Sequence, residues 1–123
     1  MASDGPTADD DQRNKRNGLA ENESLKSLGK QLNDPALRSS ARILILISLS
    51  INNKLSFVEL LELTGLGKGS LENHVEKLAA SGYVTTRNIK TFGGMRMIIE
   101  ISDKGKETCK TLLKQIGEFG NGE

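Results

Sequence analysis

The alternation of apolar and polar positions predicts a mostly helical domain that begins at Asp34-Pro35. Aspartate caps the free N–H groups of a first helical turn, and proline at the first helical position has no N–H to leave unpaired. The stretch that follows, Ala36–Ile51, contains an apolar run at Ile43–Ile47 that a buried strand could also contain. About sixteen residues without a turn signal favour a helix instead. We therefore expect one central buried helix, with Arg38 and Arg42 on its solvent-facing side.

A second, shorter helix is predicted after the turn Asn52–Lys54. Ser56 and Glu59 have the spacing of a capping box, in which each side chain binds the backbone of the other residue. This helix should end at Thr64-Gly65. Its apolar positions, all expected to face the core, are Phe57, Val58, Leu60, Leu61 and Leu63.

A third helix is predicted to begin near Gly69 or Ser70, directly after the tight turn Gly65–Gly69. It should run to about Ala80 and end at Ser81-Gly82, because glycine tolerates the left-handed conformation of a helix cap. Three apolar residues at helical spacing form its buried stripe. They are Leu71, Val75 and Leu78.

The runs Tyr83–Ile89 and Met95–Ile101 are rich in β-branched and apolar residues and flank a glycine-containing tip, so they predict a hairpin. Ile99 and Ile101 should face the core. Ser102-Asp103 then caps a last helix. Its apolar positions are Cys109, Leu112, Leu113 and Ile116. The predicted fold class is mainly α with a small β-hairpin, a winged helix-turn-helix with a three-helix core, a β-wing and a C-terminal helix.

Four segments follow from this pattern. Residues 1–22 have no apolar periodicity and are expected to be a disordered tail. Residues 23–33 carry Leu25, Leu28 and Leu32 at helical spacing, which indicates a short amphipathic helix that docks on the domain or on a second subunit. Residues 34–117 form the winged-helix domain, and residues 118–123 are expected to be flexible.

Composition excludes several classes of protein. The 17 Lys+Arg and 16 Asp+Glu residues give a net charge of +1, which excludes a histone-like balance but allows a local basic face. The single cysteine makes no internal disulfide, and without a Cys/His cluster we expect no metal and no cofactor. No apolar run approaches the ~20 residues that cross a bilayer, and the polar N-terminus lacks a signal peptide, so a cytoplasmic protein without membrane contact is expected.

The two short helices and the basic hairpin predict a surface for double-stranded DNA. A major groove about 12 Å wide admits one α-helix, whose polar side chains read the base edges. With Leu71 at the centre of the buried face, helical geometry points Ser70, Asn73 and Lys77 away from the core. Asparagine suits adenine, and lysine suits guanine or phosphate. The candidate DNA-binding residues from this geometry are Ser70, Asn73, Lys77 and Lys68 on the helix, Arg87, Lys90 and Arg96 on the hairpin, and Arg38 and Arg42 on the flank.

Asp34–Ile116, about two thirds of the chain, resembles the winged-helix transcriptional regulators of bacteria and archaea, close to the MarR and ArsR families and most similar to a small subgroup of single-domain regulators. The motifs that carry the resemblance are Asp34-Pro35…Arg38…Arg42-Ile43, Leu55–Leu60, Gly69–Leu78 running into Gly82-Tyr83-Val84, and Ile99–Gly105. The resemblance implies sequence-specific DNA binding as a homodimer, formed through the first and last helices. His74 occupies a position that resembles one of the family's DNA-binding positions. Such regulators usually carry arginine or lysine in this helix, where the present chain has Glu72 and Glu76.

Other interpretations compete with this one. The same fold could serve as a protein–protein interaction module, an adaptor or complex subunit that does not bind DNA. His74 is more easily explained as a packing residue than as a base reader, and Cys109 as inert core rather than as an oxidation sensor. Phe92 at the hairpin tip either enters a groove or folds back onto the domain.

An enzyme is not expected. A Cys109–His74 pair has no third orienting group. The glycines at 65, 67 and 69 follow a helix and lack the GK[ST] signature of a phosphate loop. The sequence does not identify a small-molecule effector. A ligand- or redox-responsive sensor is a third interpretation, and its pocket would have to form at the dimer interface.

Overall fold

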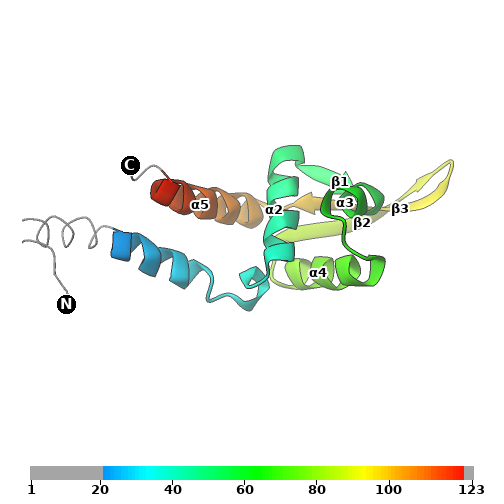
Figure 1. The fold of residues 1–123 in the computed structure, drawn as a ribbon. Helices are drawn as coiled ribbons and strands as arrows, with labels where there is room; N and C mark the ends of the chain where they lie inside the picture. The colour runs from blue at the N-terminus through cyan, green and yellow to red at the C-terminus, as the bar shows by residue number, and fades with distance from the viewer. Residues whose placement is uncertain (1–20, 121–123) are drawn as a thin grey trace, which may run out of the picture.

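The structure, a computed structural model, describes residues 21–120, with side chains up to residue 118 (Figure 1). An N-terminal helix covers residues 21–31. The remaining elements are a 3₁₀ helix η1 (Pro35–Leu37), α2 (Ser40–Asn52), β1 (Lys54–Ser56), α3 (Phe57–Thr64), α4 (Lys68–Ala80), β2 (Val84–Thr91), β3 (Gly94–Ile101) and α5 (Asp103–Gly120). This order confirms the predicted winged helix-turn-helix. Figure 1 shows the N-terminal helix and α5 at one end of the molecule and the β2–β3 hairpin projecting from the opposite end.

The sheet contains one strand more than the predicted hairpin. Its order is β1-β3-β2, and both neighbouring pairs are antiparallel. β1 pairs Lys54 with Glu100 and Ser56 with Ile98. A strand of three residues is too short for a period-two pattern to appear in the sequence. The sequence pattern therefore predicts only a turn and a helix cap in this segment.

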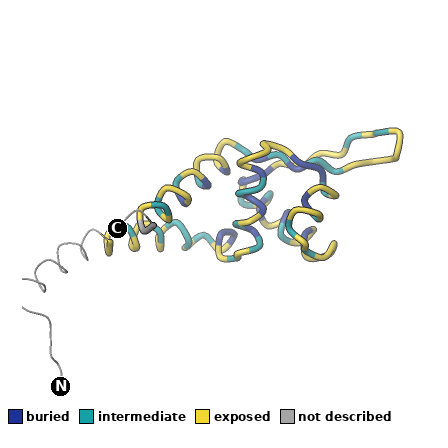
Figure 2. The backbone as a smooth tube through the Cα atoms, turned by 45° about the horizontal axis from the view of Figure 1, so that its top comes forward, coloured by how far each residue is buried: buried dark blue, intermediate teal, exposed yellow. Residues whose placement is uncertain are grey.

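The core lies where α2, α3, α4 and the sheet meet, and Figure 2 shows the buried residues concentrated on the inner sides of these elements. Leu71, Val75 and Leu78 form the buried stripe of α4, as predicted. Ile99 and Ile101 face the core from β3, also as predicted. Fully burying each such aliphatic side chain contributes roughly 1.5–3 kcal/mol.

The prediction of a continuous helix from Ala36 to Ile51 is wrong, because the chain breaks at Arg38 and Ser39. Arg38 has φ −90° and ψ 49°, and Ser39 is extended with φ −154°. The Ser39 Oγ accepts a hydrogen bond from the backbone N–H of Arg42 at 3.3 Å and caps α2. Asp34 caps η1 in the same way through the N–H of Ala36, at 3.0 Å. The sequence therefore contains two N-caps, and the second one starts the long helix.

The prediction that all five apolar residues of α3 face the core is also wrong. Leu60 is fully buried, and Phe57 and Leu61 are half-buried against the core. Val58 and Leu63 are 54% and 56% exposed. A helix of eight residues turns only about twice, so it buries one stripe and leaves its other faces in solvent.

The ends of the short helices follow the predicted signals. The capping box is present: the Ser56 N–H donates to Glu59 Oε1 at 2.9 Å, and the Glu59 N–H donates to Ser56 Oγ at 3.1 Å. Gly65 ends α3 in the left-handed conformation, with φ +68°. α4 begins at Lys68, slightly before the predicted start.

Gly105, in the first turn of α5, lies where the backbone of Tyr83 leaves no room for a side chain. A Cβ at this position would lie 2.2 Å from the backbone oxygen of Tyr83, so only glycine allows the first turn of α5 to approach the start of the hairpin this closely. The Ser102 Oγ accepts from the Gly105 N–H and donates to the Gly82 carbonyl, at 3.0 and 2.6 Å. These contacts fix the direction in which the hairpin leaves the domain.

The N-terminal helix docks on the domain, since Leu28 and Leu32 pack against the core while Leu25 stays 52% exposed. The Ser24 Oγ donates to Glu118 Oε2 at 3.1 Å and joins this helix to α5. On α5, Cys109 and Leu112 are buried. Leu113 and Ile116, the other two apolar positions predicted for this helix, are 44% and 50% exposed.

The segments predicted at the two ends of the chain lie mostly outside the described residues. Of the tail predicted at residues 1–22, the structure describes only residues 21 and 22, which are helical. Residues 118–120, predicted to be flexible, are the last residues of α5. None of the helices described has the length and apolar content needed to cross a membrane.

Candidate nucleic-acid interface

The outward face of α4 is a strip of small and polar residues. Leu71, Val75 and Leu78 hold the opposite face of the helix in the core. Helical geometry predicts that Ser70, Asn73 and Lys77 point to solvent. The structure confirms that all three are exposed. The strip consists of Gly69, Ser70, Asn73, Lys77 and Ala80. Gly69 and Ala80 place almost no side chain on it, so another molecule can approach the helix backbone.

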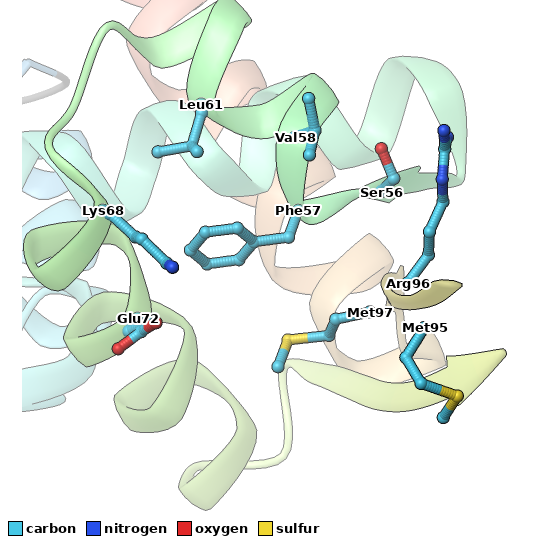
Figure 3. A pocket seen from close by; sticks show the side chains of 9 residues that line it. All are labelled: Ser56, Phe57, Val58, Leu61, Lys68, Glu72, Met95, Arg96 and Met97. Atoms are coloured by element: carbon cyan, nitrogen blue, oxygen red, sulfur yellow. The ribbon is translucent and has the colours of Figure 1, made fainter. Parts of the chain in front are cut away.

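The acidic residues of α4 lie on a different side of the helix, toward the hairpin. A groove of about 360 Å³ separates the N-terminal end of α4 from α3 and β3, and Lys68 and Glu72 line it. Figure 3 shows Phe57 between Lys68 and Met97 in this groove. A second groove of similar volume continues between α4 and β2, and Glu72 and Glu76 line it. The two carboxylates therefore flank the outward strip.

The cations of the hairpin do not share one face. Successive residues of a strand point to opposite sides. Lys90 pairs with Met95, and both lie on the side of the sheet that faces α4. Arg87 lies on the other side, beside Ile98 and Glu59. Arg96 also approaches Glu59: the pKa of this carboxyl lies below its usual range mainly because of its hydrogen bonds with Ser56, with a smaller contribution from the Arg96 charge.

Two polar residues that the sequence analysis did not select complete this surface. Thr86 and Asn88 are exposed and alternate with Lys90 along β2, so all three side chains lie on the side that faces α4. The same alternation was readable in the sequence once the strand was assigned. Phe92 at the tip is fully exposed, so it does not fold back onto the domain.

Arg42 is not on a solvent-facing side of its helix, and this prediction is wrong. The residue is only 7% exposed. Its Nε donates to the Ala36 carbonyl at 2.6 Å and its Nη2 to the Pro35 carbonyl at 3.1 Å. The Pro35 carbonyl also accepts the backbone N–H of Arg38 at 3.1 Å. The break before α2 leaves the Ala36 carbonyl without a helical partner, and the guanidinium satisfies it from inside the fold.

Arg38 is exposed, as predicted, but its guanidinium is bound to its own chain. Nε donates to the Leu32 carbonyl at 2.6 Å, and Nη2 donates to the Asn33 side-chain oxygen at 2.9 Å. Arg38 thereby joins the end of the N-terminal helix to η1.

His74 connects α4 to this arginine network. Its Nδ1 lies 2.9 Å from Arg42 Nη1 and accepts a hydrogen bond from it. The neutral ring therefore carries its own proton on Nε2. Burial and the neighbouring charges of Arg42 and Lys77 lower the pKa of His74. The ring is half-buried on the edge of α4, and the contact supports a packing role.

Nothing in residues 21–118 resembles a metal centre, since no group of three or more His, Cys, Asp or Glu residues gathers there. Cys109 is 2% exposed in the packed face of α5. The notable surface of the domain is therefore the outward strip of α4 together with the hairpin. A helix-turn-helix with an exposed polar second helix and an adjoining basic β-wing defines the class of winged-helix DNA-binding proteins.

Comparison with known proteins assigns the family. Residues 41–119 match the family model described as a winged helix DNA-binding domain. This match covers more than half of the chain, so the protein belongs to the winged helix DNA-binding domain family. An uncharacterized protein of Methanocaldococcus jannaschii, MJ0432, is 33% identical over 78 residues, which are 63% of this chain and 85% of that protein.

Solved structures agree with this assignment. A transcriptional regulator homologue from Pyrococcus horikoshii is similar with a TM-score of 0.71 and 28% identity, covering 81% of this chain and 96% of that one. A MarR family transcriptional regulator from Streptomyces coelicolor has a TM-score of 0.61 and 20% identity over 93% and 78% of the two chains. A mutant MarR from E. coli, solved with operator DNA, has a TM-score of 0.57 and 16% identity over 83% and 74%. The last two likenesses establish the MarR-like fold.

Proposed function

We propose that the protein is a sequence-specific, double-stranded DNA-binding transcriptional regulator that acts as a homodimer, with α4 in the major groove and the wing on the phosphate backbone or in the minor groove. The observation that carries the proposal is the composition of two neighbouring parts of the surface, the outward strip of α4 and the wing. The outward strip of α4 is polar and exposed, and the chain from Lys77 to Ile99 contains four cations and no Asp or Glu.

The cations of this surface are available to phosphates. Within the described part of the chain, the single salt bridge joins Lys26 to Glu23, far from α4 in the sequence. Each cation that neutralises a phosphate releases condensed counterions, which supplies the sequence-independent part of the affinity and makes it fall with salt. The five cations on α4 and the wing are Lys68, Lys77, Arg87, Lys90 and Arg96.

Sequence reading is assigned to the middle of the outward strip. Asn73 carries the amide that pairs with adenine through two hydrogen bonds, and Ser70 can donate to or accept from either partner. Lys77 and Lys68 reach guanine or phosphate. Glu72 and Glu76, beside the groove toward the wing, repel phosphates unless a cytosine amino group donates to them.

The end of the molecule opposite the wing is suited to a second copy of this chain. Leu25 on the N-terminal helix and Leu113 and Ile116 on α5 are each about half exposed. On the same helix, the Gln115 Oε1 is buried without a hydrogen-bond partner among the described residues, and a donor from a second copy would satisfy it. A two-fold dimer of this kind should prefer a pseudo-palindromic operator with half-sites about one helical turn (10–10.5 base pairs) apart.

The test combines sedimentation with titration of duplexes that carry one or two copies of a selected half-site. The wild-type protein should sediment as a dimer and bind the two-site duplex more tightly than the one-site duplex. Leu113→Glu with Ile116→Glu should give a monomer that no longer distinguishes the two duplexes. Leu63→Glu, the same change at an equally exposed leucine of α3, should remain a dimer.

A wild-type protein that binds no duplex at low salt would contradict the proposal and favour the protein–protein interaction module. A monomer that binds single half-sites would contradict only the dimer.

A further inference from the structure

The tip of the wing holds an aromatic side chain in full contact with solvent. Phe92 and Gly93 form the turn between the paired residues Thr91 and Gly94. The Thr91 Oγ1 donates to the Gly94 carbonyl at 2.8 Å, and Gly94 adopts φ +110°, which a residue with a side chain rarely adopts. Met95 follows and is 66% exposed. The hairpin thus presents an apolar tip to solvent.

Along the chain, the residues next to this apolar tip carry only positive charge, while in space Arg96 also lies near Glu59 of α3. Along the chain the nearest acids are Glu76 on α4 and Glu100 at the base of β3. Lys90 pairs with Met95 across the hairpin, and Arg96 follows Met95. An apolar protein surface would bury these cations without partners, whereas a duplex offers phosphates to the cations and bases to the ring. The charge pattern therefore points to nucleic acid as the occupant.

The tip also has the chemistry of a groove wedge. A minor groove is about 6 Å wide, and the turn consists of one aromatic residue and glycines. Phenylalanine is among the side chains that enter between base pairs from this groove, partly unstack them and kink the duplex.

We infer that Phe92 enters the minor groove as such a wedge and that Lys90 and Arg96 hold the phosphates on either side. This inference rests on the proposed function. Because the wing projects from the end opposite the N-terminal helix and α5 (Figure 1), a dimer formed through those helices carries its two tips at the outer ends of the operator. Pyrimidine–purine steps kink most easily, so the wedge selects TA or CA steps at flanking positions that α4 does not touch.

The experiment uses the full chain and a duplex that the protein itself selects from a randomised pool. 2-Aminopurine is placed at successive flanking positions, and end-to-end fluorescence energy transfer reports bending. Wild-type protein should raise 2-aminopurine fluorescence at one step in each flank and bend the duplex. Binding with normal salt dependence but without unstacking or bending would overturn the wedge and leave the proposed function intact. Absence of duplex binding would overturn both.

Three variants of the exposed tip separate a wedge from a simple phosphate contact. Phe92→Ala should abolish the fluorescence change and the bend and weaken binding about tenfold, with the salt slope unchanged. Phe92→Leu should keep part of the bend, because leucine is also a wedging residue. Phe92→Lys should steepen the salt slope without restoring the bend. Unchanged bending in Phe92→Ala, with thermal unfolding like that of the wild type, would overturn the inference.

Discussion

The arginines at the start of α2 and the cations of α4 and the wing show how the same charge serves two purposes in one small domain. Arg38 and Arg42 are both bound to backbone carbonyls of their own chain. Lys77 and Lys90 are exposed on α4 and β2. Arg42 folds inward because the break before α2 leaves the Ala36 carbonyl without a helical partner, whereas the cations of α4 and the wing project into solvent.

The largest expected effect on stability comes from removing the buried arginine, Arg42. Arg42→Ala leaves the Ala36 carbonyl and the His74 Nδ1 without their donor and removes one of two donors to the Pro35 carbonyl, so it should lower the free energy of unfolding by about 3 kcal/mol. Urea unfolding followed by circular dichroism measures the change. Arg38→Ala, at an exposed residue, should cost less than about 1 kcal/mol. Equal losses for the two variants would contradict the division between buried and exposed arginines.

On the other side of the comparison, the strongest expected effect belongs to Asn73. Asn73→Ala should weaken binding to the selected operator by about 1–3 kcal/mol and relax the preference at one base pair, because it would remove the bidentate contact to adenine that we propose for this residue. Anisotropy titrations against single-base operator variants measure both effects. Asn22→Ala, at an exposed asparagine of the N-terminal helix, is the control and should bind like the wild type. A loss that is uniform over all duplexes would assign Asn73 to the phosphates instead.

Lys90→Ala should produce that uniform pattern with a smaller effect. Affinity for every duplex should fall by a similar factor, and the slope of log K against log salt should flatten by about 0.9, the contribution of one phosphate contact. Titrations of operator and random duplexes at several salt concentrations give the slope. Lys106→Ala, at an exposed lysine of α5, is the matched control and should leave it unchanged. A loss confined to the operator would indicate base reading by the wing.

The smallest expected effect concerns the contact between the two regions, Arg42 with His74. The pKa of His74 is lowered in the folded protein, so the unfolded chain binds its proton more tightly. The contribution of neutral His74 to the free energy of unfolding is therefore fully present above about pH 6.5 and is lost as the pH falls toward the pKa of His74 in the folded protein. Urea midpoints at pH 7.5 and 5.5 should show a loss below about 1 kcal/mol that is absent in His74→Gln. The chain has no other histidine, so the same pH dependence in the variant would contradict this assignment.

Most of the order of the elements could be predicted because many boundaries carry a local signal, such as the capping box at Ser56 or the left-handed glycine at Gly82. The buried stripe of α4 followed from the 3.6-residue period alone. The face on which a polar residue lies could be predicted only where the element itself was assigned correctly. Ser70, Asn73 and Lys77 are exposed as expected, because α4 is a regular helix.

The prediction for Arg42 was wrong because its helix was not assigned correctly. The second N-cap at Ser39 divides the predicted helix, and the Ala36 carbonyl that this break leaves without a helical partner binds the arginine inside the fold. The short strand β1 depends on hydrogen bonds to β3, more than forty residues away in the chain. Such pairing leaves no local trace in three residues. The sequence also does not predict that Glu72 and Glu76 face the hairpin, because this depends on how the hairpin packs against α4.

The central claim is that the cations of α4 and the wing, and not those of the α2 start, contact duplex DNA. The most direct test is the salt slope of operator binding for the wild type, for Lys77→Gln with Lys90→Gln, and for Arg38→Gln. We predict a slope that flattens by about 1.8 in the double variant, two phosphate contacts at about 0.9 each, and does not change in Arg38→Gln. Equal slopes in all three proteins, or a flattening found only in Arg38→Gln, would contradict it.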